Sequence, residues 1–542
     1  MSDRFLPDWQ QLSLEQQIAQ LLVVRTSGAY FDSQIAYPQY EAPRDRLQHW
    51  IGELGVGGVI LLGGNAAEVA LRCQQLQEWA TVPLLIAADI EEGVGQRFAG
   101  AVQFPPPLAL AAIASQDPDR AQQLARSFGE ITAAEAIAIG LNWILAPIVD
   151  INNNPANPVI NVRAFGEDPE TVSQLTTAFI AGAQQFPVLT TAKHFPGHGD
   201  TATDSHLELP QIPHSRSRLD AVELQPFRQA IAAGVDAVMT AHLSIPALDP
   251  DYPATLSPAV LQGLLRRDLG FEGLIVTDAL VMQAIAAHYG PGEAARLAFE
   301  AGADILLMPA DPEAAIQEIA EAICEGQIRY DRLEESLARI WRAKQKVCGA
   351  RPASFLPHAW EQEPAIAIDL EAVSQPKYWA IAAEILTASQ EQQGQPLSLQ
   401  SGINLIVGDR LLQATYLSGA APARQLLSDH SLQLQIWDTE TGTTPTLTQP
   451  TLVQWFIRGN PFRGSAGANQ VVETLLQQLL DQDQLLGLVI YGSPYIWRQW
   501  RSQLPTDLPA IFSYGQTTQA QAIALQSILQ SADSSKVEAF TT

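Results

Sequence analysis

A histidine-rich stretch between residues 193 and 206 carries the side chains best suited to chemistry. It reads Lys-His-Phe-Pro-Gly-His-Gly-Asp-Thr-Ala-Thr-Asp-Ser-His. Asp204 and His206 are separated by one residue, so the carboxylate can reach the imidazole, fix its tautomer and raise its basicity. A histidine held in this way can give a proton to a leaving group and later take one from water. On spacing alone, the alternative of a weakly coupled pair on an exposed loop stays open.

Asp278 is the second candidate, because it follows the apolar run 274–277 directly. An ionised carboxylate at the end of a buried strand needs either a hydrogen-bond network or a catalytic role. In glycoside cleavage, one carboxylate attacks the anomeric carbon while an acid protonates the departing oxygen. Asp278 and the Asp204–His206 pair supply these parts, with a histidine in place of the usual second carboxylate.

A metal site competes for the same stretch. The possible zinc ligands are His194, His198, Asp200, Asp204 and His206. No HxH pair or helical HExxH spacing fixes two of them together, and Lys193 would add positive charge beside a cation. We therefore predict no metal and no other cofactor.

The elements that must position these residues are short apolar runs alternating with helical patterns. The runs are 21–24, 56–62, 82–88, 141–148, 188–192, 235–240, 274–277 and 303–308, and amphipathic segments include 67–80, 120–139, 170–184, 219–233 and 292–301. Runs without polar alternation are typical of strands buried on both faces. Eight of them over some 300 residues predict an α/β fold that begins with a (β/α)₈ TIM-type barrel.

Polar residues stand where these runs end. They are Arg25, Asp89, Asp150, Lys193 with His194, His242 and Asp278. Each alone marks no more than the point where a buried strand emerges, but in a closed barrel all of them meet at the C-terminal mouth, where active sites of this architecture form. We expect the site there.

The length of 542 residues predicts more than one domain. We expect a catalytic barrel at 1–350, a proline-marked linker at 351–376 and a smaller α/β sandwich domain at 377–542. Its strand candidates are 403–408, 485–491 and 510–513, and its helix candidates include 471–480 and 519–529. No second set of catalytic-looking residues is recognisable in this half.

The composition limits the kinds of partner that we expect the protein to bind. The formal charge of −27 argues against nucleic acid and anionic membrane surfaces, which both favour Lys and Arg. The N-terminus lacks a basic stretch followed by an apolar one, and no run reads as a membrane span. Cys73, Cys324 and Cys348 form no CxxC pair, which is typical of reduced thiols and predicts a cytoplasmic protein. The oligomeric state is not predicted.

The motifs resemble glycoside hydrolase family 3, and within it the bacterial NagZ-like β-N-acetylglucosaminidases. The Lys-His-Phe-Pro-Gly-His-Gly run followed by Asp-x-His carries the resemblance. The segment Thr-Asp-Ala-Leu at 277–280 and the segment Arg-Ala-Phe-Gly-Glu-Asp-Pro at 163–169 match two further family motifs in the expected order. The match covers about residues 15 to 345 well, and the C-terminal half only loosely.

This resemblance implies roles for individual residues. Asp278 is the expected nucleophile of a covalent glycosyl-enzyme, and His206, oriented by Asp204, is the expected acid/base. The residues expected to hold the hydroxyls of the terminal sugar are Asp89, Arg97, Arg163, Lys193 and His194. Structural salt bridges are the alternative role for the two arginines. One departure lies beside Asp89, where Glu92 replaces a family glycine and bears on the contact expected of Arg97.

The implied activity is removal of terminal β-linked N-acetylglucosamine from glycans, with peptidoglycan fragments as the expected substrate. Related β-glucosidases with a second domain draw their acid/base glutamate from it, whereas this barrel already carries Asp204 and His206. The alternatives are a β-glucosidase or β-glycoside phosphorylase of the same family, and a non-catalytic sugar-binding protein.

Overall fold

The computed structural model describes residues 6–201, 209–348, 368–397, 401–411, 414–427, 432–459, 467 and 469–529. In its first part, eight parallel strands form a sheet in the order β7-β6-β5-β4-β3-β2-β1-β8, and a bridge between Val276 and Ile305 joins the two ends. The strands are β1 (Leu22–Ser27), β2 (Gly58–Leu62), β3 (Leu85–Ala88), β4 (Trp143–Ile144), β5 (Leu189–Phe195), β6 (Ala237–Thr240), β7 (Leu274–Val276) and β8 (Leu306–Leu307). Each of the eight predicted runs overlaps one of them, and six contain theirs entirely, whereas β1 and β5 continue three residues beyond the runs predicted for them, so the predicted barrel is confirmed.

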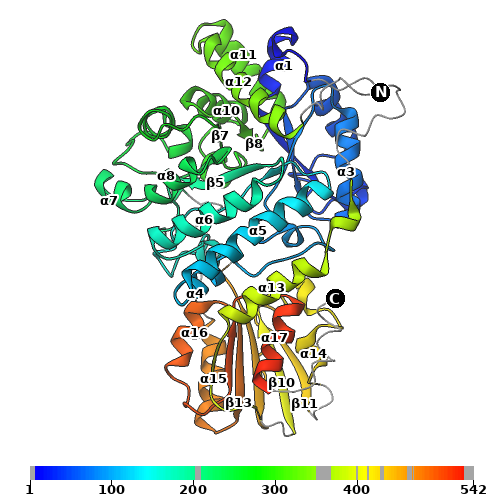
Figure 1. The fold of residues 1–542 in the computed structure, drawn as a ribbon, viewed down its shortest axis with the longest axis vertical. Helices are drawn as coiled ribbons and strands as arrows, with labels where there is room; N and C mark the ends of the chain where they lie inside the picture. Colours follow the sequence, from blue (N-terminus) through cyan, green and yellow to red (C-terminus); the bar gives the residue numbers. More distant parts are fainter. Residues whose placement is uncertain are drawn as a thin grey trace. The chain divides into compact units, whose positions relative to one another are not determined.

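Helices surround this sheet (Figure 1). They include α3 (Ala66–Trp79), α5 (Pro118–Ala138), α6 (Pro169–Ala183), α8 (Leu224–Ala232), η7 (Ala259–Asp268), α10 (Pro291–Ala301), α11 (Pro312–Cys324) and α12 (Tyr330–Val347). Helix α6 begins where the sequence provides both start signals, an N-cap Asp168 that accepts from Thr171 N and a proline at the first helical position. The predicted helix 219–233 is instead two helices, α7 (Arg216–Ala221) and α8, because Val222 leaves the helical conformation.

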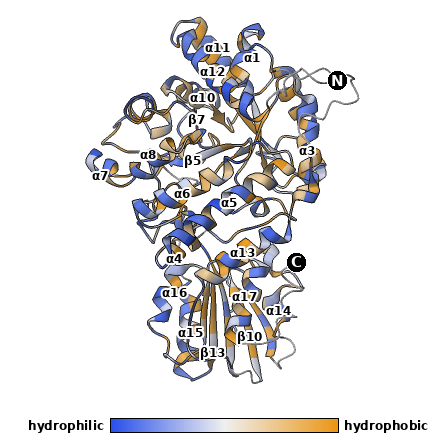
Figure 2. Cartoon of the chain, viewed as in Figure 1, coloured by the Kyte–Doolittle hydropathy of each residue, from blue (hydrophilic) through white to orange (hydrophobic). Residues whose placement is uncertain are grey.

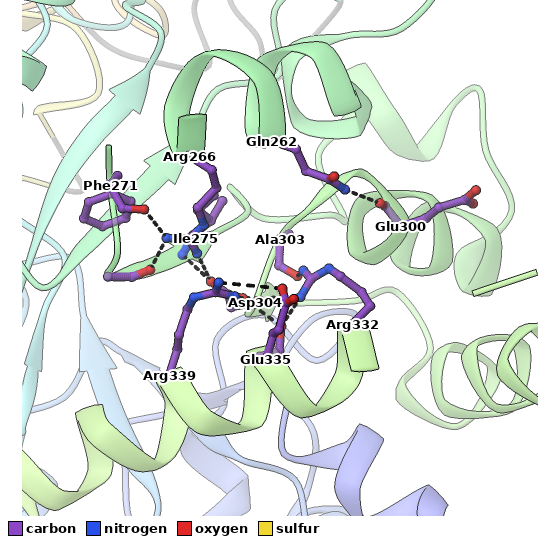
Figure 3. Close-up of polar contacts among 12 residues, drawn as sticks. Gln262, Arg266, Phe271, Ile275, Glu300, Ala303, Asp304, Arg332, Glu335 and Arg339 are labelled. Carbon is purple, nitrogen blue, oxygen red and sulfur yellow. Dashed lines mark hydrogen bonds and ion pairs between the residues drawn. The ribbon is translucent and has the colours of Figure 1, made fainter. Parts of the chain in front are cut away.

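A buried ion cluster fastens the closing strands of the barrel (Figure 3). Asp304, fully buried just before β8, accepts from Ile275 N of β7 at 2.9 Å and from Ser336 Oγ of α12 at 2.7 Å. The guanidinium groups of Arg266, Arg332 and Arg339 lie around the same carboxylate. A buried carboxylate needs this number of donors, and here they tie η7, β7, β8 and α12 together.

The second sheet has six strands in the order β11-β10-β12-β13-β14-β9, all parallel except β9. They are β9 (Glu391–Gln393), β10 (Gly402–Gly408), β11 (Leu432–Asp438), β12 (Thr451–Ile457), β13 (Leu485–Gly492) and β14 (Ala510–Ser513). On β14, Ile511 belongs to the core cluster that includes Leu525 of α17 (Thr518–Leu529), while the next residue, Phe512, stacks on Trp497 of α16 (Pro494–Arg501). Helices therefore cover both faces, which confirms the predicted α/β sandwich. Strands β9, β11 and β12 were not predicted.

Contact density divides the chain into two compact units. The first consists of 1–102, 122–154 and 164–375, and the second of 103–121, 155–163 and 376–542. Two stretches within the predicted barrel sequence thus group with the second unit, and most of the predicted linker lies outside the described residues. In both units the apolar residues concentrate on the strands (Figure 2). None of the helices in the described ranges is long and apolar enough to span a membrane.

Candidate active site

The strand register places Lys193 on the same face of the closed sheet as Val276, the strand residue nearest to Asp278. Lys193 pairs with Met239 and Met239 with Val276, and Asp278 follows two residues later. Paired residues of parallel strands share a face, and residues two apart along a strand return to it. Lys193 Nζ also lies 2.8 Å from Asp89 Oδ1, which comes from β3 on the other side of β4. A contact that bypasses the intervening strand runs through the barrel interior, so this face points inward.

A bulge in β5 turns two consecutive side chains toward that interior. The register between β5 and β6 shifts between Lys193 and Phe195, which inserts one extra residue. Bulges of this kind re-aim side chains that strict alternation would send outward. His194 is re-aimed onto Asp150, which lies two residues beyond Ile148, the bridge partner of Lys193. The side chains of Lys193 and His194 therefore both point toward the barrel interior, although the two residues are neighbours in sequence.

Two glycines, Gly197 and Gly199, shape the chain after β5. Gly197 has a φ of +127°, and a Cβ there would lie 2.8 Å from the Cβ of Glu223. A Cβ on Gly199 would lie 1.6 Å from the carbonyl oxygen of Ile151. Only glycine tolerates both the backbone conformation and the close approach. The loop is consequently pressed against the chain that follows β4.

Lys193 is held between two carboxylates. Its Nζ lies 2.8 Å from Asp89 Oδ1 and 2.6 Å from Glu91 Oε1. The side chains of Lys193 and Glu91 are 1% and 4% exposed, whereas that of Asp89 is 27% exposed. A buried ammonium is tolerated only with such partners. Of the three groups, Asp89 is the one that faces the open mouth.

Asp150 fixes His194. Its Oδ2 accepts from His194 N at 3.1 Å and lies 2.7 Å from His194 Nδ1, and its Oδ1 accepts from His198 N at 2.6 Å. Burial alone would raise the pKa of Asp150, but the charge of His194 and these hydrogen bonds hold the pKa below its ordinary value. An ionised carboxylate only accepts, so Nδ1 of His194 carries a proton and Nε2 is the nitrogen left for a ligand.

His198 is the buried neighbour of this pair. Its ring lies edge-on to that of His194, with 6.2 Å between the centroids, and its Nδ1 lies 3.0 Å from Thr201 Oγ1. Burial lowers the pKa of His198 to about 4, against the opposing charges of Asp150 and Asp278. The ring is therefore neutral near pH 7, and it lies within reach of the charge of Asp278.

The segment around Asp278 is fastened on the β8 side. Thr277 donates its N–H to Ile305 O at 3.0 Å, and its Oγ1 accepts from Leu307 N at 2.9 Å. Leu280 N donates to Leu307 O at 2.9 Å. The half-buried carboxylate itself accepts from Ala279 N at 2.7 Å through Oδ1. Asp278 thus projects from a short turn whose flanking residues are both fixed.

His242 fastens the same segment on the β6 side. Its Nε2 lies 3.0 Å from Ala279 O, and its Nδ1 lies 2.9 Å from Thr255 Oγ1. A carbonyl only accepts, so Nε2 carries the hydrogen of this bond. The sequence singled out His242 only as a strand-end residue, and the structure shows that it binds the residue after Asp278.

The two arginines are placed differently. Arg97 is exposed and donates from Nε to Asp89 O at 3.0 Å, so it stays beside Asp89 although Glu92, which is buried, replaces the family glycine. Arg163 belongs to the second compact unit, where its Nη1 donates to Val159 O at 2.9 Å. Arg97 therefore lies beside Asp89 in the candidate site.

The predicted acid/base pair, Asp204 and His206, lies outside the described residues. Of the other ligands considered for a metal, Asp200 Oδ2 lies 2.9 Å from His214 Nε2, and His194 is engaged by Asp150. Across the part of the chain that the structure describes, no three His, Cys, Asp or Glu residues are grouped so as to hold a metal ion.

Sequence reasoning missed one supporting carboxylate, Glu91, and named Asp150 as a strand-end residue without giving it a partner. Asp150 stood at the end of a predicted strand, and that position was the available signal for it. Glu91 has no such mark, because its partner Lys193 is 102 residues away in the chain and only the closed barrel brings the two together.

Comparisons with known proteins match both parts of the chain to domains of one family. Residues 13–343 match the Glycosyl hydrolase family 3 N terminal domain, and residues 395–530 match the Bacterial Glycosyl hydrolase family 3 C-terminal domain. A Beta-hexosaminidase A of Pseudoalteromonas piscicida is 35% identical over 333 residues, which are 56% of this chain and only 55% of that protein. A Beta-hexosaminidase of Alkalilimnicola ehrlichii is 40% identical over 264 residues, covering 48% of this chain and 75% of that protein.

A solved structure resembles the whole chain. The glycoside hydrolase family 3 β-N-acetylglucosaminidase from a Paenibacillus species has a TM-score of 0.77 and 30% identity, over 96% of this chain and 97% of that one. The resemblance inferred from the motifs is thereby confirmed. Since the family match spans more than half of its residues, the chain belongs to glycoside hydrolase family 3.

Proposed function

We propose that this chain is a retaining glycoside hydrolase that removes terminal β-linked N-acetylglucosamine from glycans. The observation that supports it most directly is the inward face shared by Asp278, Lys193 and Asp89 in a family 3 barrel. One carboxylate is fixed by its neighbouring backbone, and a second faces the same space with a buried cation behind it. This is an arrangement suited to attack on a bound sugar.

In the proposed reaction, Asp278 attacks the anomeric carbon and forms a covalent glycosyl-enzyme. The hydrogen bond from Ala279 N to Oδ1 orients the carboxylate for this attack. His206, oriented by Asp204, protonates the departing oxygen and then removes a proton from the water that releases the sugar. Each step transfers one proton through the same imidazole, as retaining hydrolysis requires.

The hydroxyls of the terminal sugar are assigned to Asp89, Lys193, His194 and Arg97, while the role that the resemblance implies for Arg163 stays a prediction. Asp89 is the most exposed member of its ion cluster and offers acceptors that Lys193 holds in place. His194 offers Nε2, because Asp150 occupies its Nδ1. Charged groups at a mouth that excludes water form strong hydrogen bonds to hydroxyls.

We propose that the substrates are fragments of peptidoglycan and that the protein cleaves them in the cytoplasm. This context rests on the resemblance in sequence and on three free cysteines, of which Cys73 is buried. Burial raises the pKa of the Cys73 thiol well above its ordinary range, so this residue is suited to packing and not to redox chemistry.

The decisive experiment is turnover of a panel of aryl β-glycosides by the intact chain and by Asp278→Asn. We expect preference for the N-acetylglucosaminide, an anomerically retained first product, and a loss of at least about 10³-fold in kcat in the variant, because the nucleophile is removed. Asp311→Asn is the matched control, since an asparagine can also cap helix α11 through Glu313 N and Ala314 N. Substantial turnover by Asp278→Asn would show that Asp278 is not the nucleophile.

The panel also separates the alternatives. Faster turnover of the glucoside would make the enzyme a β-glucosidase. A sugar phosphate appearing as product when inorganic phosphate is added would make it a phosphorylase. Binding of N-acetylglucosamine without turnover of any glycoside would leave a sugar-binding protein.

A further inference from the structure

The loop between β1 and helix α2 (Arg44–Gln48) lies at the same mouth and is anchored outside the barrel along its first part. Tyr30 OH accepts from Gln75 Nε2 at 3.3 Å, and Gln34 Nε2 donates to Glu68 Oε1 at 3.2 Å. Both partners belong to α3, which covers the outside of the sheet. The loop thus starts over α3 and then returns toward the barrel.

Arg25 of β1 points into the barrel. The next residue, Thr26, accepts a hydrogen bond from Arg72 of α3 and therefore faces outward. Alternation along the strand turns Arg25 to the opposite face, the interior. The register agrees, because Arg25 pairs with Ile60 and Ile60 with Ala87, two residues before Asp89. Arg25 accordingly faces the same space as the proposed sugar site.

The returning part of the loop packs on this arginine. Arg25 Nη2 lies 2.9 Å from Oε1 of the buried Glu41, and Glu41 Oε2 accepts from Tyr37 N at 3.3 Å. The guanidinium carbon lies 5.4 Å from the ring centre of Tyr37 and 5.5 Å from that of Tyr40. Tyr37 and Tyr40 nevertheless remain 53% and 47% exposed. Both rings are held through contact with the guanidinium while much of their surface faces solvent.

We propose that Tyr37 and Tyr40 form the binding platform for the aglycone sugar, the residue on the far side of the bond that is cleaved. This rests on the proposed function. With the terminal sugar among Asp89, Lys193 and His194, the next sugar leaves through the mouth, and the loop that returns to Arg25 follows β1, two strands away from β3, which ends beside Asp89. A β-linked pyranose carries its substituents around the edge and exposes an apolar C–H face. A tyrosine offers a flat apolar surface with a polar tip, and so fits such a sugar.

The platform is tested with a ligand that separates the two sugars. Binding of the sulfur-linked disaccharide of N-acetylglucosamine, which is not cleaved, is measured by calorimetry beside binding of the monosaccharide. For the double variant Tyr37→Ala with Tyr40→Ala we expect at least about tenfold weaker disaccharide binding, because each of the two aromatic contacts is worth about a factor of two to ten and both are lost. Monosaccharide binding should change less than about twofold.

Matched variants guard against a folding defect. Tyr37→Phe with Tyr40→Phe keeps both rings over Arg25 and should retain disaccharide affinity within about threefold. Tyr330→Ala removes a ring that is 43% exposed but contacts Gln17 of helix α1 (Leu14–Ala19), before β1 and so at the opposite end of the barrel, and should leave both affinities unchanged.

Turnover completes the design. For the natural oxygen-linked disaccharide, kcat/KM should fall with the affinity, while kcat/KM for the methyl glycoside, which has no second sugar, should hold. Unchanged disaccharide affinity in the double alanine variant would overturn the platform, as would equal losses for monosaccharide and disaccharide. If the wild-type protein binds the disaccharide through the two rings but cleaves neither substrate, the proposed function fails and the platform stands.

Discussion

Replacing Asp150 with asparagine should lower the activity although none of the residues assigned to the sugar is itself replaced. The carboxylate receives three hydrogen bonds, from His194 N, His194 Nδ1 and His198 N. An asparagine has one oxygen, which can keep the 2.6 Å bond to His198 N. Its amide NH₂ group then takes the place of Oδ2 and faces the backbone N–H of His194, so that two donors oppose each other. To accept from the same NH₂ group, Nδ1 of His194 must lose its hydrogen. The ring then keeps its hydrogen on Nε2 only, and a charged hydrogen bond at Nδ1 no longer sets its orientation.

The magnitude follows from the bonds that are lost. A hydrogen bond to a charged group contributes about 1.5–3 kcal/mol, and Asp150→Asn loses the one from His194 N and inverts the one at Nδ1. We expect the free energy of unfolding to fall by about 3 kcal/mol. We expect kcat/KM to fall by about 100-fold, since misplacing one group that contacts the substrate has an effect of this size.

The assay compares Asp150→Asn with Asp304→Asn at a temperature where circular dichroism shows both folded. Asp304 is an equally buried carboxylate that also accepts several hydrogen bonds, but it lies at the closure between β7 and β8. Asp304→Asn should lose stability and keep its kcat/KM. Wild-type kcat/KM in Asp150→Asn, or equal kinetic losses in the two variants, would refute the inference that Asp150 acts by orienting His194.

Two further predictions concern His242 and Lys344. His242→Gln keeps a donor near Ala279 O and should hold kcat within about threefold, whereas His242→Asn should lower kcat about tenfold at unchanged KM; steady-state kinetics on an aryl glycoside decide, and equal losses would contradict a positioning role. Lys344 is fully buried on Gln20 Oε1, and burial lowers its pKa from 10.5 to about 7. Because the pKa of Lys344 is lower in the folded protein than in the unfolded chain, the buried charge destabilises the fold most at a pH below the folded value. Lys344→Met removes this charge but leaves Gln20 Oε1 without its donor, which costs about 1–3 kcal/mol. The free energy of unfolding should therefore rise by a net amount of about 2 kcal/mol near pH 6. Urea titrations should show this gain shrinking toward pH 10, and a gain independent of pH would contradict it.

The barrel could be predicted because its strands are buried on both faces. Such strands appear in sequence as short apolar runs, and six of the eight runs end at or near a polar residue where the chain reaches the mouth. Asp89, Lys193 and Asp278 were predicted in this way; Lys193 Nζ lies 2.8 Å from Asp89 Oδ1, and the strand of Lys193 is linked through Met239 to Val276, two residues before Asp278. In the second unit the same rule found β10, β13 and β14.

Apart from β12, a buried run that is apolar except for Thr451 and Gln454, what escaped prediction depends on distance in sequence or on alternation. Glu91 owes its place to Lys193, and no local pattern links them. Strand β11 alternates leucine with glutamine, so it lacks the continuous apolar run that was sought, and β9 is a three-residue edge strand of polar residues. The inward turn of His194 depends on a bulge, which the sequence of β5 does not announce.

The most direct test of the proposed reaction is capture of its covalent intermediate. The intact chain is incubated with a fluorinated N-acetylglucosaminyl fluoride that slows release of the sugar from the enzyme, then digested and analysed by mass spectrometry. We predict one adduct, on the carboxylate of Asp278. An adduct on another residue, or turnover of the reagent with no adduct at all, would contradict the assignment of Asp278 as the nucleophile.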